Sequence, residues 1–408
     1  MTHDTPLLTT MVAGLGLAFL LGLLAHRLRL PMIAGYLVAG VIIGPFTPGY
    51  VADQHLAQEL AEMGVILLMF GVGLHFSLKD LMAVRAIAIP GALGQIALAT
   101  LAGMALGWAL GWGLGAGLVF GLSLSVASTV VLLRALQEQG VVQEPRGRIA
   151  VGWLIVEDLV MVVVLVLVPP LAGLLGGQTA PLDGEAAEVA RMGFGPVAAT
   201  LMVTGVKVAG FVALMLVVGR RVIPWVLHYV AHTGQRELFR LSVLSIALGV
   251  AWGSATFFGV SFALGAFFAG MVMAGSSLSA QAMKDTLPLR DAFAVLFFVS
   301  VGMLFDPSVI WQAPLALLAT VVIIVGVKAV AAYAITRAFG HERDVALTIA
   351  ASLAQIGEFS FILIVMGVSL DIVPDAARDL VVAGALVSIL ANPLLFWAAD
   401  LRRARQPV

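Results

Sequence analysis

The sequence predicts an all-α integral membrane protein, because charged residues are scarce and apolar stretches of helical length recur throughout it. Only 11% of the 408 residues are charged and 61% are hydrophobic, whereas soluble domains carry about 25% charged residues. This composition excludes a soluble enzyme and a disordered scaffold, and the net charge of −1 argues against a nucleic-acid-binding protein. The apolar stretches also lack the two-residue alternation of membrane β-strands.

Thirteen segments have the apolar character that a membrane-crossing helix needs over about 20 residues. The uncharged run Leu241–Met283 is too long for one span, so we expect a turn at Gly253–Ser254 to divide it. Two segments, 31–45 and 289–305, are short enough to be mistaken for re-entrant loops. The expected spans are 7–25, 31–45, 56–76, 86–110, 114–136, 147–171, 195–219, 236–254, 257–275, 289–305, 311–337, 345–367 and 377–399.

The distribution of Lys and Arg over the loops predicts the orientation, because cytoplasmic loops are enriched in these residues. With these spans, 18 of the 22 Lys and Arg residues fall on one side of the membrane and only Arg191 and Arg378 on the other. Lys207 and Lys328 lie inside spans. We therefore expect an odd number of spans, with the amino terminus outside and the carboxyl terminus, including the tail 400–408, in the cytoplasm.

Thirteen spans divide naturally into six, one and six. A single intervening helix places the second six upside down relative to the first, which is the arrangement of an inverted repeat. Segment 195–219 would be the linker helix. A chain of helices without internal symmetry is the alternative, and the orientation does not distinguish the two.

Ionisable residues near span centres are the first candidates for function, because each costs about 2.5–3.5 kcal/mol to insert there. Glu157 and Asp158 are adjacent, and adjacent helical residues point about 100° apart. We expect one to meet a permeant species and the other to meet a neighbouring helix. A carboxylate removed from water is a site at which a proton and a metal cation compete. A salt bridge to another helix is the alternative interpretation.

Two lysines also lie at mid-membrane. Lys328 is the natural counter-ion for one of the two acids, and a structural pairing and a functional coupling are both compatible with that position. Lys207 lies in the expected linker helix, where a structural or lipid-facing role is favoured over transport.

Two polar segments inside expected spans are further candidates for function. Gly357 stands between Gln355 and Glu358 at the centre of a span, which favours a broken helix whose freed carbonyls line a cavity. Four hydroxyls crowd the apolar segment 114–136, namely Ser123, Ser125, Ser128 and Thr129. Hydroxyl and carbonyl oxygens suit alkali cations rather than soft metals, although hydroxyls also join helices in membranes. Both segments are fifth in their halves, which favours one shared central site.

Other chemistry has little support. His26 and His75 lie at span ends and are expected to be interfacial. No His-Glu-x-x-His motif exists for a membrane metalloprotease, and no phosphate-binding loop exists for an ATP-driven pump. The sequence has no cysteine, and we expect no cofactor.

Five ordered motifs resemble the Kef-type monovalent cation:proton antiporters, and within them the YbaL-type branch. The likeness runs along essentially the whole chain, and the motifs are Leu30–Pro45, Ser123–Thr129, Gly147–Asp158, Phe297–Met303 and Gln355–Phe359. The resemblance implies the NhaA/Kef-type fold, with thirteen helices, two discontinuous crossing helices and a homodimer. It also implies a dimerisation part formed by 1–78 and 236–305, and a mobile core part formed by 86–171 and 311–399.

The same resemblance implies roles for individual residues. Asp158 matches the aspartate that binds the ion and the proton, and Glu157 occupies the position before it. Lys328 matches the lysine that pairs with that position in electrogenic relatives. Ser128, Thr129 and segment 355–358 match the two broken helices, with Ser125 a further oxygen near the site.

The chain departs from the Kef pattern in two places. Kef-type proteins carry a cytoplasmic nucleotide-binding regulatory domain after the last helix, and this sequence ends at Val408. Either the sequence is part of a longer protein or this member lacks that control. The family's acidic regulatory loop is poorly matched by Ser276–Arg290, whose charges before the arginine are Lys284 and Asp285, so the resemblance does not extend to glutathione gating.

The sequence therefore predicts a monovalent cation/proton antiporter of the bacterial inner membrane, surrounded by lipid and independent of nucleic acid. Asp158 would bind a proton or an alkali cation in turn, with K⁺ favoured over Na⁺ and the Glu157–Asp158 pair keeping Na⁺ open. A cation channel lined by the serine-rich helix and a sodium-coupled organic-anion symporter are the alternatives.

Overall fold

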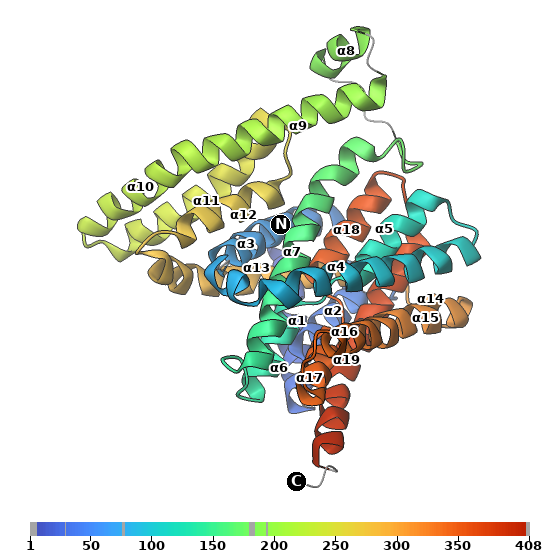
Figure 1. The fold of residues 1–408 in the computed structure, drawn as a ribbon. Coiled ribbons are helices and arrows are strands. Elements are labelled where there is room, and N and C mark those ends of the chain that lie inside the picture. Colours follow the sequence, from blue (N-terminus) through green and yellow to red (C-terminus); the bar gives the residue numbers. More distant parts are fainter. Residues whose placement is uncertain (1–5, 29, 76–77, 179–183, 193–194, 405–408) are drawn as a thin grey trace, which may run out of the picture.

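The computed structural model describes residues 6–28, 30–75, 78–178, 184–192 and 195–404, and these residues fold into helices joined by short connections (Figure 1). The first half contains α1 (Pro6–Arg27), α2 (Met32–Ile43), α3 (Gln54–His75), α4 (Leu78–Ala109), α5 (Leu114–Ser125), α6 (Thr129–Glu138) and α7 (Pro145–Leu171). The middle contains α8 (Gly184–Arg191), α9 (Pro196–Leu214), the π-helical turn η1 (Met215–Gly219) and α10 (Arg220–His232). The second half contains α11 (Arg236–Phe258), α12 (Phe262–Ala274), α13 (Ser279–Met303), α14 (Val309–Gln312), α15 (Pro314–Val321), the π-helical turn η2 (Val322–Val327), α16 (Lys328–Ala338), α17 (Arg343–Leu353), α18 (Glu358–Ser369) and α19 (Asp375–Ala404).

The predicted all-α membrane architecture is confirmed. Among the described residues, nine helices are long and apolar enough to cross a membrane, or ten if the bent pair α17–α18 forms one span. Three apolar helices, α2, α5 and α12, are shorter. Each of the thirteen expected segments overlaps one of these helices or a broken pair of them. The last residue of the expected span 56–76 and the end of the tail, 405–408, lie outside the described residues.

The turn expected at Gly253–Ser254 is wrong, because α11 continues to Phe258. Within the helix, the Ser254 hydroxyl donates a hydrogen bond to the Ala251 carbonyl over 2.7 Å, so this serine does not break it. The chain turns at Gly259, whose φ of 63° lies in the left-handed region that glycine tolerates. Ser261 then caps α12 by accepting the Leu264 backbone N–H over 3.3 Å.

The linker helix is longer than the expected 195–219. The chain stays helical from α9 through η1 and α10 to His232, and this long helix runs beside α11 in Figure 1. The exposed Arg220 and Arg221 were expected to begin a loop, yet the apolar face continues beyond them and is buried at Ile223, Leu227 and Val230. A charged pair on the outer face therefore does not end the helix.

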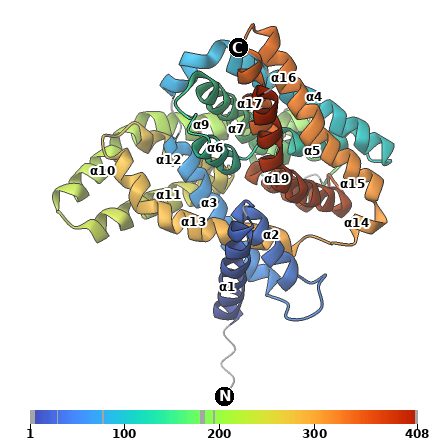
Figure 2. The same cartoon turned by 90° about the horizontal axis from the view of Figure 1, so that it is seen from below.

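The helices that precede and follow this long helix in the sequence pack into two groups, which Figure 2 shows side by side. In the first group, α1–α3 pack with α11–α13, and in the second, α4–α7 pack with α15–α19. Close backbone approach holds the first group together at two places. A Cβ on Gly40 would lie 2.0 Å from the Val299 carbonyl oxygen, and a Cβ on Gly270 would lie 2.1 Å from the Phe70 carbonyl oxygen. The candidate ion-binding residues all lie in the second group.

Candidate ion-binding site

Two interrupted helices meet at the centre of the second group. The first break, 126–128, separates α5 from α6, and the second, 354–357, separates α17 from α18. The Ser128 backbone N–H donates to Gln355 Oε1 over 2.9 Å, and Gln355 Nε2 donates to the Ser128 carbonyl over 3.2 Å. A Cβ on Gly357 would lie 2.3 Å from the Ser128 Cβ, so glycine permits this approach. The two segments predicted to be interrupted are therefore interrupted, and they touch.

The helix ends at these breaks are buried, and their carbonyl oxygens need partners because no water is available to them inside a membrane. Side chains on neighbouring helices supply the donors. The Ser125 carbonyl accepts from Gln95 Nε2 (3.2 Å), the Gln355 carbonyl from Lys328 Nζ (2.7 Å) and the Ala351 carbonyl from Asn392 Nδ2 (2.9 Å).

Glu157 and Asp158 lie on α7 beside the first break, and their surroundings differ. Glu157 is completely buried, with Oε2 accepting the Ala127 backbone N–H over 2.8 Å and Oε1 accepting from Gln95 Nε2 over 2.6 Å. Asp158 is 5% exposed, and its Oδ2 accepts from the Thr129 hydroxyl over 3.2 Å. The other oxygen of Asp158, Oδ1, is buried without a hydrogen-bond partner among the described residues. One acid thus has both oxygens bonded to its neighbours, whereas the other has one oxygen without a hydrogen-bond partner in the described structure.

A third acid lies at the end of the second break. Glu358 is the first residue of α18 and is 1% exposed, and its Oε2 accepts from the Ser128 hydroxyl over 3.0 Å. Its charge acts on Asp158 together with that of Glu157. Three carboxyl groups therefore surround the first turn of α6.

Lys328, the expected counter-ion, is fully buried and interacts electrostatically with Glu157. Its ammonium donates to the Gln355 carbonyl, and it lies within 4 Å of no carboxylate among the described residues. Lys328 thus supplies a positive charge to Glu157 while it binds the backbone of the second break.

The four hydroxyls of the predicted cluster divide into two pairs. Ser123 and Ser125 donate to carbonyls of their own helix, those of Val119 and Leu122, over 2.9 and 2.7 Å. Ser128 and Thr129 lie beyond the break and contact the acids. The structure therefore brings Ser128 and Thr129 to the site and leaves the Ser125 hydroxyl bound to its own helix.

The remaining candidates lie elsewhere. Lys207 forms an ion pair with Glu185 of α8, with an N–O distance of 3.0 Å, in agreement with a structural role. His26 is exposed in the last turn of α1. The side chain of His75 lies outside the described residues.

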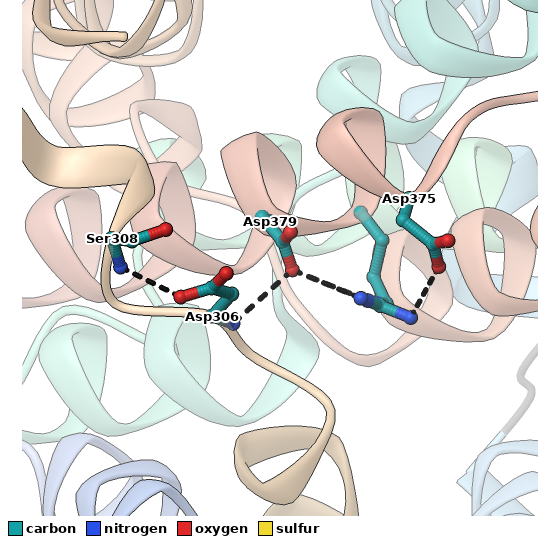
Figure 3. A network of polar contacts seen from close by, with 5 residues as sticks. Asp306, Ser308, Asp375 and Asp379 are labelled. Carbon is teal, nitrogen blue, oxygen red and sulfur yellow. Dashed lines mark hydrogen bonds and ion pairs between the residues drawn. The ribbon is translucent and has the colours of Figure 1, made fainter. Parts of the chain in front are cut away.

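Two sets of polar residues were not predicted from the sequence. Gln95 is the one amide in segment 86–110, and that isolated polar residue was a signal for the site. Around Asp379, Figure 3 shows a polar network that joins α19 to the connection between α13 and α14. Asp379 Oδ1 accepts the Asp306 backbone N–H over 3.3 Å and pairs with Arg378 over 3.2 Å, and Arg378 also pairs with Asp375 over 2.8 Å.

Asp158 Oδ1 and the Thr129 hydroxyl are both oxygen ligands, a type that hard cations prefer and soft metals do not. No group of three or more His, Cys, Asp and Glu residues that could hold a metal ion occurs within the described part of the chain.

A helical membrane fold with buried acids where two interrupted helices touch is typical of ion transporters. The chain belongs to the sodium/hydrogen exchanger family, whose transmembrane model matches residues 15–397. This finding confirms the family resemblance that the five motifs predicted, and members of such a family exchange ions without a cofactor.

The names of similar proteins agree with this family assignment. The chain is 61% identical over 396 residues to an Escherichia coli (strain K12) protein named as a putative cation/proton antiporter, YbaL, and the match covers 97% of this chain and 69% of that protein. It is 32% identical to K(+) efflux antiporter 4 of Arabidopsis thaliana over 90% of this chain and 59% of the plant protein. The sodium proton antiporter MjNhaP1 from Methanocaldococcus jannaschii has a similar fold, with a TM-score of 0.68, 17% identity and 97% coverage of both chains.

Proposed function

We propose that the protein exchanges a monovalent cation for protons by alternating access, and that Asp158 binds the two in turn. One observation carries the proposal. Within the described part of the chain, Asp158 Oδ1 is buried without a partner, while both oxygens of neighbouring Glu157 are hydrogen-bonded. An unpaired buried carboxylate oxygen is costly to maintain, and a site that binds charged cargo accounts for it.

Competition at a single carboxylate is sufficient for exchange. A proton and an alkali cation each neutralise Asp158, and the site holds one of them at a time. If the site crosses the membrane only when neutralised, inward movement of one species is coupled to outward movement of the other. No ATP is needed, because either gradient drives the other.

The packing of the helices supports a moving part and a static part. The first helix group corresponds to the proposed dimerisation part, 1–78 and 236–305, and the second to the proposed core part, 86–171 and 311–399. In the sequence, the linker helix follows the core segment 86–171 and precedes the dimerisation segment 236–305. We assign the movement to the second group, because it contains Asp158.

Internal similarities support a six-one-six inverted repeat of thirteen spans. The break at 126–128 and the break at 354–357 each interrupt the fifth expected span of their half. Gly40 of α2 packs on α13, and Gly270 of α12 packs on α3, so the second span of each half contacts the third span of the other. An odd number of spans places the two termini on opposite sides of the membrane, and the distribution of Lys and Arg over the loops supports an external amino terminus and a cytoplasmic carboxyl terminus.

For the remaining details we infer K⁺ as the preferred cation, a homodimer, and the bacterial inner membrane as the location. The name of the plant relative, a K⁺ efflux antiporter, and the Kef-type motifs support K⁺. The identity to the E. coli relative supports the bacterial membrane.

The proposal is tested in everted vesicles that contain a pH-sensitive dye. Addition of KCl or NaCl should dissipate the proton gradient with the wild-type protein and not with Asp158→Asn. Asp375→Asn is the matched control, because its side chain is 71% exposed and pairs with Arg378 outside the site. If Asp158→Asn responds fully to both salts, the carrier role is wrong, and current without obligatory proton movement in a planar bilayer would indicate a channel instead.

A further inference from the structure

An apolar groove of about 510 Å³ lies between α7 and the linker helix. Val166, Leu167 and Pro170 of α7 form one wall, and eight residues from Leu201 to Leu216 form the other. Its lining within the described structure contains a single polar side chain, that of a threonine. Ligand sites in proteins occupy about 300–1,000 Å³ and have mostly apolar linings, so the groove has the size and the character of a binding site.

The groove is open to the surroundings of the protein and lies within membrane-crossing helices. Leu167 and Leu216, one on each wall, are 42% and 49% exposed, and both walls belong to helices that are long and apolar enough to cross a membrane. The stretch 201–216 is about 22 Å long at 1.5 Å per residue, whereas one leaflet of the hydrocarbon core is about 15 Å thick. An acyl chain of one leaflet therefore fits along the groove.

Two arginines follow the groove at one end. Arg220 lies four residues, or about one helical turn, beyond Leu216, and Arg221 comes next. Both side chains are exposed, and neither forms an ion pair with an acid among the described residues. Arginine binds phosphate through two parallel N–H donors, so one end of this apolar groove carries the charge that an anionic headgroup requires.

Aromatic rings beside these arginines mark the level of the lipid headgroups. Trp225 and Tyr229 follow Arg221 at intervals of four residues, on one face of α10. They are 66% and 68% exposed, and their rings stack with centroids 6.0 Å apart. The opposite face of α10 is buried against the protein. Trp and Tyr are enriched at the membrane–water boundary, where basic residues also attract anionic lipids.

We propose that the groove binds one acyl chain of an anionic phospholipid, whose phosphate is bound by Arg220 and Arg221. The lipid belongs to the leaflet that contains these arginines, which is the cytoplasmic leaflet in the proposed orientation. The acyl chain is held by apolar contact with the two walls, and the headgroup is held by charge. The site does not include Asp158 and does not depend on which ion is exchanged.

A second copy of the chain is the alternative occupant of the groove. On the proposed function, α7 belongs to the moving core part, and the linker helix belongs neither to that part nor to the dimerisation part. A protein partner in contact with both walls would tie the moving part to a second molecule. A flexible acyl chain fills the same space and follows the movement, so we favour the lipid.

Native mass spectrometry of the delipidated protein with added phosphatidylglycerol tests the headgroup contact. We expect tighter binding of phosphatidylglycerol than of phosphatidylcholine, which has no net charge. Combining Arg220→Gln with Arg221→Gln should weaken phosphatidylglycerol binding about thirtyfold, as the loss of two basic residues at an anionic surface predicts. Arg343→Gln is the matched control, because Arg343 is exposed at the start of α17 and does not line the groove. Unchanged binding in the double variant overturns the inference.

Filling the groove tests the acyl-chain contact. Ala209 and Ala213 line the groove, so Ala209→Phe and Ala213→Phe should each weaken the binding of both lipids about tenfold by displacing part of the chain. Val206→Phe is the matched control, because Val206 is 72% exposed on the same helix and lies outside the lining. Lipid binding that is equal in the groove variants and in Val206→Phe would overturn the inference.

Two further outcomes of the same experiment identify a different occupant and would also overturn it. Glycerophosphoglycerol, the same headgroup without acyl chains, should not displace the lipid; displacement would show that the arginines form a phosphate site alone. The oligomeric mass should be the same in the wild-type protein and in both groove variants. A dimer that becomes a monomer in Ala209→Phe and Ala213→Phe would show that a second copy occupies the groove.

Discussion

Ser128 and Gln355 hold each other through two hydrogen bonds, although 227 residues separate them in the sequence. The Ser128 N–H donates to Gln355 Oε1 over 2.9 Å, and Gln355 Nε2 returns a bond to the Ser128 carbonyl over 3.2 Å. One side chain thereby satisfies both backbone groups of the residue that caps α6. The two helix breaks form a single structural unit, and the acids are arranged around it.

Replacing Gln355 with Leu should separate this unit. The substitution leaves the buried N–H and carbonyl of Ser128 with fewer partners, and we expect the free energy of unfolding to fall by about 2 kcal/mol or more. Thermal unfolding in lipid nanodiscs measures the effect. Gln312→Leu is the control, because Gln312 is exposed on α14. Equal stability of the two variants would contradict the role of the Ser128–Gln355 pair.

Thr129→Val tests the hydroxyl that faces Asp158. The change preserves the branched shape but removes the donor at 3.2 Å from Oδ2. We expect the cation concentration for half-maximal exchange to rise about tenfold, as the loss of one hydrogen bond to a charged group predicts. Thr129→Ser retains a hydroxyl and should stay close to wild type. Similar affinities for the Val and Ser variants would show that the hydroxyl is not involved.

Gly357→Ala tests the distance between the two breaks. The added methyl group would lie 2.3 Å from the Ser128 Cβ, so Ser128 and segment 354–357 must move apart. We expect loss of most exchange activity and a lower unfolding temperature. Gly249→Ala in α11 is the matched control, since a Cβ there has no neighbour within 4 Å beyond its own helical turn in the described structure, and alanine favours a helix by about 1 kcal/mol over glycine. Retained activity in Gly357→Ala would show that the breaks tolerate separation.

Two aspartates of the network in Figure 3 differ in burial, and this difference predicts different costs. The Asp379 side chain is 10% exposed and that of Asp375 is 71% exposed, and both pair with Arg378. Asp379→Ala should lower the free energy of unfolding by about 2 kcal/mol, because it leaves the Asp306 N–H and Arg378 without this acceptor. Asp375→Ala should cost less than about 1 kcal/mol, as exposed ion pairs do. Chemical denaturation of the detergent-solubilised protein compares them, and equal losses would argue against a stabilising contact at Asp379.

The sequence indicated the buried polar residues most clearly where a residue breaks a strong local rule. Glu157, Asp158, Lys328 and Glu358 are conspicuous because charges are costly inside a membrane, and Gly357 beside Glu358 indicated a break. Local rules failed at Gly253–Ser254, because a serine hydroxyl that bonds its own helix leaves that helix intact.

Other features depend on tertiary contacts that no local pattern specifies. The Ser125 and Thr129 hydroxyls lie on either side of the first break, yet one bonds its own helix and the other bonds Asp158. Gln95 was missed because a single amide has no periodicity, and its importance appears only when α4 is placed beside α5 and α7. The position of a donor along a helix was predictable, whereas its acceptor was not.

The π-helical turn η2 ends at Val327, directly before Lys328. Such a turn contains one residue more than the α-helical turn it replaces, so it sets the angular phase of everything that follows. Deleting one residue from Val322–Val327 would restore a regular helix and rotate the lysine by about 100° relative to α15. The position of the Lys328 ammonium at the Gln355 carbonyl therefore depends on the number of residues in Val322–Val327 as well as on the lysine itself. A change of length in this apolar stretch would move the ammonium away from that carbonyl without altering any polar side chain.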